Sequence, residues 1–185
     1  MKQMVSLCFL FQSLTVAAQY DTTAYAALLS STSEVYLADS ISINNTPWPM
    51  NRLDSSTIKN WFPQLLPSSA NNRLRNRSYY LAGKITSSSN FDLLIVLEEK
   101  KKADSTISQV VYLITNKKDG AYIASLEIPI TGASKRKSSF STSSWLYKDY
   151  KIVQDSKITV NQRSYADLKK YRINGSGRFI LSPNY

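Results

Sequence analysis

The chain has 185 residues and a formal net charge of +10, from 23 Lys and Arg against 13 Asp and Glu, with no histidine and a single cysteine, Cys8. Without histidine, the most common general base of enzymes is absent, and so is every Ser–His or Cys–His nucleophile pair. A zinc site built from histidine and cysteine is excluded for the same reason.

The first nineteen residues predict a secretory signal peptide. Lys2 gives a short positive start, residues 4–14 are mostly apolar, and small residues lead up to Ala18 and Gln19. This is the layout of a signal peptide that is cleaved after Ala18 or Gln19. The apolar run is too short and too interrupted to span a membrane.

An alternative interpretation of this N-terminus makes Cys8 a lipid-anchored cysteine. It is disfavoured because the bulky Leu7 stands where a small residue is needed before the cysteine. We therefore expect residues 1–19 to be removed, and the protein to be exported to the periplasm, the cell surface or the medium. The remaining residues 20–185 then form a single mainly β domain without cysteine, which must be stabilised by its core and not by disulfides. No later segment is apolar for long enough to cross a membrane as a helix.

The first part of the expected mature chain predicts a short helix and an interrupted strand. Residues 21–23 can cap a helix over residues 24–29, which are good helix formers. Residues 35–37 and 41–43 are typical of one interrupted strand, which the turn residues 44–49 would end.

A second helix is expected to begin at Asp54. Asp54 is a suitable N-cap, and Leu53 before it can contact Ile58 in a hydrophobic staple. Ile58 and Trp61 are three residues apart and so share one face of the helix. Pro63 then ends it.

The rest of the chain is a succession of short β-type runs separated by polar turns. The predicted runs are residues 79–86, 91–99, 107–115, 121–130, 139–147, 150–154, 157–161, 169–173 and 178–181. Gly120 and the glycines of residues 174–177 can take the positive φ that tight hairpin turns require. The predicted fold class is therefore mainly β, at the margin of α+β. We expect an antiparallel meander, arranged as a sandwich or a partly closed barrel, with one or two short N-terminal helices.

Two of these runs are apolar on both faces. Residues 93–97 and 110–114 do not alternate between polar and apolar side chains, so we expect them to be central strands covered on both sides. The cover could be the Asp54 helix with Trp61, a second sheet, or the same sheet curling over. Residues 157–160 alternate more clearly and should lie nearer an edge or an open face.

Three segments give the chain a wider resemblance: the end of the signal peptide at residues 16–19, the hairpin at 112–128 and the closing strands at 171–180. In these segments the chain resembles a loosely defined group of uncharacterised exported β-meander proteins from Bacteroidetes-type bacteria. The resemblance implies the fold and the location, and it brings no activity and no functional residues.

Catalysis in this chain would depend on carboxylates or lysines. Glu98 and Glu99 are adjacent, so in a strand they point to opposite faces and cannot act as a pair; we expect a solvated strand end here. A glycosidase pair would have to come from distant residues such as Asp92, Glu127 or Asp149, and nothing in the sequence selects them. The sequence carries neither a phosphate-binding loop nor a dinucleotide fingerprint, and we predict no cofactor and no metal.

Clusters of positive charge are the other functional signal. The two candidate clusters are Arg73, Arg75 and Arg77, and Lys135, Arg136 and Lys137. In an extended segment the first three would share one face, where guanidinium groups suit phosphate or carboxylate partners. The competing interpretation is a solubilising surface, which also explains a third group at residues 100–102.

The sequence therefore predicts an exported, non-catalytic binding or envelope-associated module for an anionic glycan or another polyanion. Nucleic acid is disfavoured as the partner, and no residue pattern sets the oligomeric state. The alternative is a carboxylate-dependent hydrolase that acts on cell-envelope or extracellular glycans.

Overall fold

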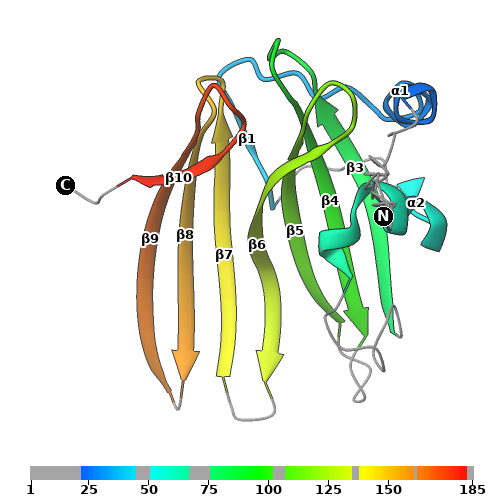
Figure 1. Cartoon of the computed structure of the whole chain (residues 1–185). Helices are drawn as coiled ribbons and strands as arrows, with labels where there is room; N and C mark the ends of the chain where they lie inside the picture. The colour runs from blue at the N-terminus through cyan, green and yellow to red at the C-terminus, as the bar shows by residue number, and fades with distance from the viewer. Residues whose placement is uncertain are drawn as a thin grey trace, which may run out of the picture.

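The computed structural model of the chain describes residues 22–44, 51–66, 76–101, 107–134, 138–160 and 162–182. Figure 1 shows a mainly β protein in which long antiparallel strands follow one another and two short helices lie at one side. The predicted fold class is confirmed. Among the described residues no helix has both the length and the apolar character to span a membrane.

From residue 77 onward each predicted run overlaps a strand, but β9 begins at Arg163, six residues before the predicted start at 169, because its pairing with β8 continues to Val160. In chain order the elements are α1 (Thr22–Ser30), β1 (Ser40–Ser42), β2 (Asn51–Arg52), α2 (Ser55–Trp61), the 3-10 turn η1 (Pro63–Leu65), β3 (Arg77–Ile85), β4 (Asp92–Lys101), β5 (Ile107–Asn116), β6 (Tyr122–Ser134), β7 (Ser138–Tyr147), β8 (Lys151–Val160), β9 (Arg163–Ile173) and β10 (Phe179–Ser182). The two runs predicted at 150–154 and 157–161 form one strand, β8, because the polar residues between them simply continue the ladder.

The interrupted strand expected at residues 35–37 and 41–43 is wrong in its first half. Only Ser40–Ser42 form a strand, while Glu34 makes a single parallel bridge with Lys84. The Val35 amide donates to the Lys84 carbonyl at 2.8 Å. The segment therefore crosses from β3 to β7 and pairs with each only briefly.

The strands form one antiparallel order, β10-β9-β8-β7-β6-β5-β4-β3-β2, with β1 beside β7. β6 and β7 pair only where residues 131–134 meet 138–141, so the sheet divides there into two five-stranded halves. One half holds β2–β6, and the other holds β1 and β7–β10. The end strands β2 and β10 do not pair with each other in the described part of the chain, so the sheet stays open and forms no closed barrel.

A side chain completes the sheet where β1 ends. Beside β7, the side-chain Nδ2 of Asn44 donates to the Thr142 backbone carbonyl, and its side-chain Oδ1 accepts from the Ser144 backbone amide at 2.9 Å. Asn44 thus occupies the place that a strand backbone would take. This matters because unpaired backbone groups are costly when they are buried.

The main core lies between the two halves. Leu93 and Ile95 of β4 and Leu113 of β5 pack in one cluster with Leu146 of β7 and Ile152 of β8, and all five are 0% exposed. The apolar side chains come from both halves, so burying them holds the bent sheet together.

The helices cover the outer face of the first half. Leu94 and Val96 of β4 and Ile114 of β5 pack with Tyr25 of α1 and Trp61 of α2 in a second cluster. Successive residues of β4 therefore alternate between the two cores, which confirms that the central strands are covered on both sides. The helices cover one face of these strands, and the second half of the sheet covers the other.

Helix α2 forms as its sequence predicts. Asp54 is the N-cap: its carboxylate accepts from the Thr57 amide at 2.7 Å and from the Ser56 hydroxyl at 2.6 Å. These hydrogen bonds, the one from Ser56 foremost, lower the pKa of Asp54 to about 2. Leu53 and Ile58 lie in the same cluster, as a staple requires, and the helix stops at Trp61, two residues before Pro63.

Candidate functional site

Two hollows meet at the exposed end of β3, each of about 370 Å³. The first is lined by Arg52, Leu53, Asp54, Ser55, Ile58, Arg77, Ser78 and Tyr79. The second is lined by Arg52, Asn76, Arg77, Ser78, Glu99, Lys101 and Ile107. Both contain Arg52, Arg77 and Ser78, and we call the combined surface the Arg52–Arg77 surface.

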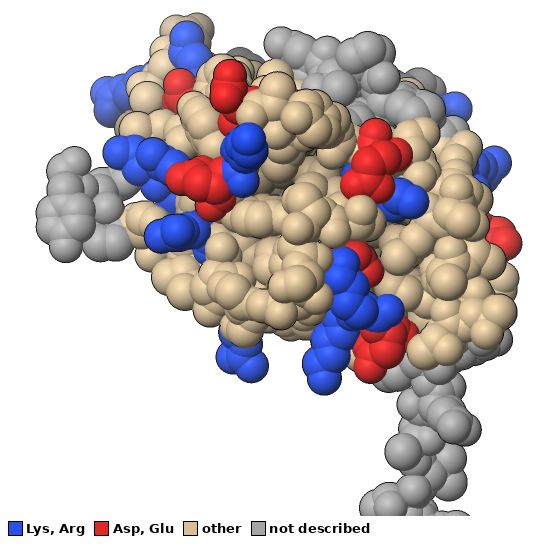
Figure 2. Space-filling view, turned by 90° about the horizontal axis from the view of Figure 1, so that it is seen from above, with Lys and Arg blue, Asp and Glu red and all other residues tan. Residues whose placement is uncertain are grey.

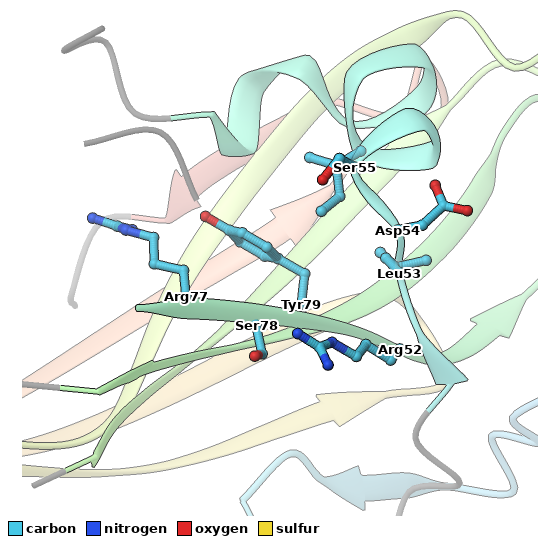
Figure 3. Close-up of a pocket in the computed structure, with 8 residues that line it drawn as sticks. Arg52, Leu53, Asp54, Ser55, Arg77, Ser78 and Tyr79 are labelled. Atoms are coloured by element: carbon cyan, nitrogen blue, oxygen red, sulfur yellow. The ribbon is translucent and has the colours of Figure 1, made fainter. Parts of the chain in front are cut away.

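The two arginines come from neighbouring strands but lie on different sides of β3. Figure 3 shows Arg77 and Tyr79 on the side of α2, with Ser78 and Arg52 on the other side. Strand alternation explains this, because Arg77 and Tyr79 are two residues apart and Arg52 lies opposite Tyr80. A ligand that contacts both guanidinium groups must therefore wrap around the edge of β3.

Arg77 is held in place by a buried carboxylate. Its guanidinium pairs with Glu98 of β4, whose side chain is 3% exposed, while that of Arg77 is 21% exposed. The Tyr112 hydroxyl donates to the other carboxylate oxygen at 3.0 Å. Burial lowers the pKa of Arg77 and Glu98 raises it, and the net shift is upward. The guanidinium keeps further N–H donors that Glu98 does not use.

The tyrosines beside this pair stay protonated far above neutral pH. Burial, followed by the charge of Glu98, raises the pKa of Tyr79 to about 12 and that of Tyr112 still further. The Tyr79 hydroxyl donates to the Leu65 carbonyl at 2.9 Å, so it ties η1 to the sheet. Glu98, Tyr112 and Tyr79 thus fix the position of the Arg77 side chain.

Arg52 and Lys101 are the accessible cations of the surface. Both residues are exposed, and neither forms an ion pair with an acidic residue in the described part of the chain. Backbone contacts place Lys101, since its amide donates to the Asn76 carbonyl at 2.8 Å. Asn76 has a φ of 59°, a left-handed turn conformation that suits asparagine, and it starts β3 at Arg77.

The two carboxylates on the surface are already engaged. Asp54 caps α2, and Glu99 accepts from the Gln109 amide group at 2.9 Å. Glu98 and Glu99 point to opposite faces as expected, but the expectation that both are solvated is wrong for Glu98. Its burial follows from Arg77 and Tyr112, which lie diagonally across the neighbouring strands and compensate its charge.

Of the six cations proposed from the sequence, the structure places only Arg77. Arg73, Arg75, Lys135, Arg136 and Lys137 lie outside the described residues. Sequence reasoning missed Arg52, which stands alone between a turn and a helix cap. Lys101 belongs to the run 100–102, which the sequence alone explains as a solubilising group.

The distant carboxylates considered for hydrolysis lie elsewhere. Asp92 is 2% exposed. One of its carboxylate oxygens pairs with the Lys118 ammonium at 2.5 Å, and the other accepts from the Tyr25 hydroxyl at 3.4 Å. Glu127 is exposed on β6, and Asp149 accepts from the Lys151 amide in the turn before β8. None of the three lines the Arg52–Arg77 surface. No group of three or more acidic side chains that could hold a metal ion occurs in the residues described.

Elsewhere the charges are mixed. Figure 2, which looks down on the end that is uppermost in Figure 1, shows Lys and Arg beside Asp and Glu in small groups. Positive charge on this face therefore forms no continuous patch.

Comparisons with protein-family models, curated proteins and solved structures find no match for this chain.

Proposed function

We propose that the protein is an exported binding module without catalytic activity, and that it recognises an anionic group of an envelope glycan or another polyanion at the Arg52–Arg77 surface. One observation carries the proposal: two exposed cations without an acidic partner in the described residues, Arg52 and Lys101, flank an arginine that Glu98 holds in position. Guanidinium groups bind carboxylate, phosphate or sulfate through two parallel hydrogen bonds.

The arrangement favours an extended anionic polymer over a compact anion. Arg52 and Arg77 lie on opposite sides of β3, so a chain that bears several charges can contact both in passing around the strand end. Catalysis has no comparable support, because Asp54 and Glu99 already accept hydrogen bonds and do not form a free pair.

The test uses the double variant Arg52→Gln/Lys101→Gln. Binding of heparin and of lipopolysaccharide is measured by calorimetry over a series of salt concentrations. We expect wild-type affinity to fall with salt, because bound cations displace counterions from the polymer. The variant should bind about a hundredfold more weakly or worse, since it removes two cations whose charged hydrogen bonds each contribute on the order of 1.5–3 kcal/mol, and its salt dependence should be flatter.

The matched control is Lys157→Gln/Lys169→Gln, which removes the same charge from exposed positions of β8 and β9. It should bind as wild type does. Equal losses in both double variants would mean that only net charge matters, and an absence of salt-sensitive binding in the wild type would reject the proposal. Replacing Arg73, Arg75 and Arg77 together is a poorer test, because it also removes the partner of buried Glu98.

Export is the second part of the proposal, and it is supported by the pattern of residues 2–19. N-terminal sequencing of protein recovered from the cell envelope or the medium should give a start at Gln19 or Tyr20. Cytoplasmic protein that retains Met1 would contradict it.

A further inference from the structure

Strand β9 extends well beyond its outer neighbour. It pairs with β8 along Arg163–Arg172, whereas β10 pairs only with its last part, Lys170–Ile173. Figure 1 shows β9 at the margin of the sheet, with β10 crossing near one end. Within the described ranges, no strand pairs with the outer edge of residues 163–167. Such an edge is a template for another strand.

The same part of the hairpin carries exposed apolar side chains. Ile158 is 41% exposed, Val160 38% and Tyr165 55%. Ile158 lies directly opposite Tyr165, and Val160 opposite Arg163, so these four side chains share one face. The apolar strip thus runs up to the outer edge of β9.

The turn between β9 and β10 shows which residues of β9 direct their backbone N–H and C=O groups toward this outer edge. The Asn174 amide donates to the Arg178 carbonyl at 3.0 Å, and Phe179 pairs with Ile173. In an antiparallel ladder, every second residue directs its N–H and C=O to the same neighbour. Counting back from Asn174, the groups that face outward between residues 163 and 167 belong to Ser164 and Ala166.

We propose that a second copy of this chain adds to the outer edge of β9, antiparallel and about a two-fold axis at Tyr165. Ser164 and Ala166 then exchange backbone hydrogen bonds with the partner's Ala166 and the partner's Ser164. Tyr165 stands opposite the partner's Tyr165, in the type of pair that brings side chains closest. The two-fold axis makes each contact occur twice.

Charge complementarity selects this register. With the axis at Tyr165, Arg163 lies opposite the partner's Asp167, and Asp167 opposite the partner's Arg163. An axis at Ala166 would place Arg163 against the partner's Lys169, and an axis at Asp167 would place two aspartates together. Asp167 now contacts Lys169 at 3.1 Å, but both side chains are 48% exposed, so that ion pair is weak and easily exchanged.

The experiment is a charge swap read out by molar mass, using light scattering after size exclusion over a dilution series. Wild-type protein should show twice the mass of one chain. Arg163→Asp places two aspartates opposite each other, and Asp167→Arg two arginines, so each variant alone should run as a monomer. Mixed in equal amounts they should form a dimer again, because every opposed pair is then of opposite sign.

Recovery in the mixture is a result that misfolding cannot produce. Lys157→Glu on the neighbouring strand is the control, and it should leave the dimer intact. Ala166→Pro should give a monomer with an unchanged circular dichroism spectrum, since it removes only an outward-facing N–H of an edge strand. A monomeric wild type, dimeric single variants, or a mixture that stays monomeric would each overturn the proposal.

Discussion

Gly120 lies directly against Trp61: a β-carbon built on the glycine would stand 2.7 Å from Trp61 Cζ3 and 2.8 Å from Tyr25 Cγ. Gly120 belongs to the turn between β5 and β6, Trp61 ends α2, and Tyr25 lies in α1. The two aromatic rings contact each other, with centroids 5.2 Å apart. Both helices are therefore docked on the sheet at a point where only a glycine leaves enough room.

The first prediction follows from this contact. Gly120→Ala should lower the free energy of unfolding by on the order of 2–4 kcal/mol, because a φ of 91° is strained for alanine and the added methyl overlaps two rings. Urea unfolding measures the change. Gly175→Ala is the control, since nothing lies within 4 Å of its β-carbon position, and it should change stability little. Equal effects of the two substitutions would contradict the packing described.

The second prediction concerns the central strands. The amides of Leu93–Leu97 and Val111–Ile114 should exchange with deuterium most slowly, because the cores on both faces of β4 and β5 must separate before these hydrogen bonds open. The amides of α1, in which most residues are exposed, should exchange faster. Hydrogen exchange with mass spectrometry reads both regions in one experiment, and the reverse order would show that the core lies elsewhere.

The third prediction addresses the Arg77–Glu98 pair. Glu98→Ala should cost about 3 kcal/mol, because it leaves Arg77 and the Tyr112 hydroxyl partly buried without their acceptor. The double variant Arg77→Leu/Glu98→Leu should cost less than the two single losses together, since it leaves no unpaired charge. Glu99→Ala, next in sequence but on the other face, should cost far less. Strict additivity in urea unfolding would rule out a coupled pair.

The fourth prediction is a loss of stability in alkali. Burial raises the pKa of Tyr79 from 10.0 to about 12, so between these values the unfolded chain releases a proton that the folded chain retains. The stabilisation is complete below pH 10 and declines by about 1.4 kcal/mol per pH unit up to pH 12. Tyr25 and Tyr112, whose pKa values burial also raises, steepen the decline.

Unfolding by urea across this pH range measures the slope. Tyr79→Phe should make the slope shallower, whereas Tyr36→Phe, at a side chain that is 82% exposed, should not change it. If all twelve tyrosines of the folded protein ionised together near pH 10, the prediction would fail.

Local signals were enough for most of the secondary structure. The start of α2 depends on Asp54 and its own next three residues, and its end on Pro63, so both can be predicted without the fold. The β5–β6 turn likewise depends on Gly120, whose φ is positive as predicted. The unbroken apolar run of residues 93–97 predicts a doubly covered strand, but it does not say which of the three possible covers (the Asp54 helix, a second sheet or the same sheet curling over) lies on each face.

The candidate site could be predicted only in part. The spacing of Arg77 from Arg73 and Arg75 indicates a cationic site, but it does not indicate that Glu98 is the partner of Arg77. Arg52 is 25 positions earlier in the numbering, and nothing in the residues around it indicates that it shares a hollow with Arg77. Glu98 has the same local pattern as Glu99, so its burial could not be inferred.

The sequence by itself determined that strands succeed one another after residue 77, that Gly120 forms a turn and that α2 begins after Asp54 and ends before Pro63, because each of these depends on contacts within a few residues. The tertiary structure alone decided that β1 joins β7, that the sheet bends between β6 and β7, and that Glu98 is buried beside Arg77. These outcomes depend on segments that are distant in the sequence: Asn44 donates to Thr142, and Ile95 and Ile152 lie in one core cluster. Contacts of this kind stabilise the protein only when the whole chain has folded, so local sequence patterns do not reveal them.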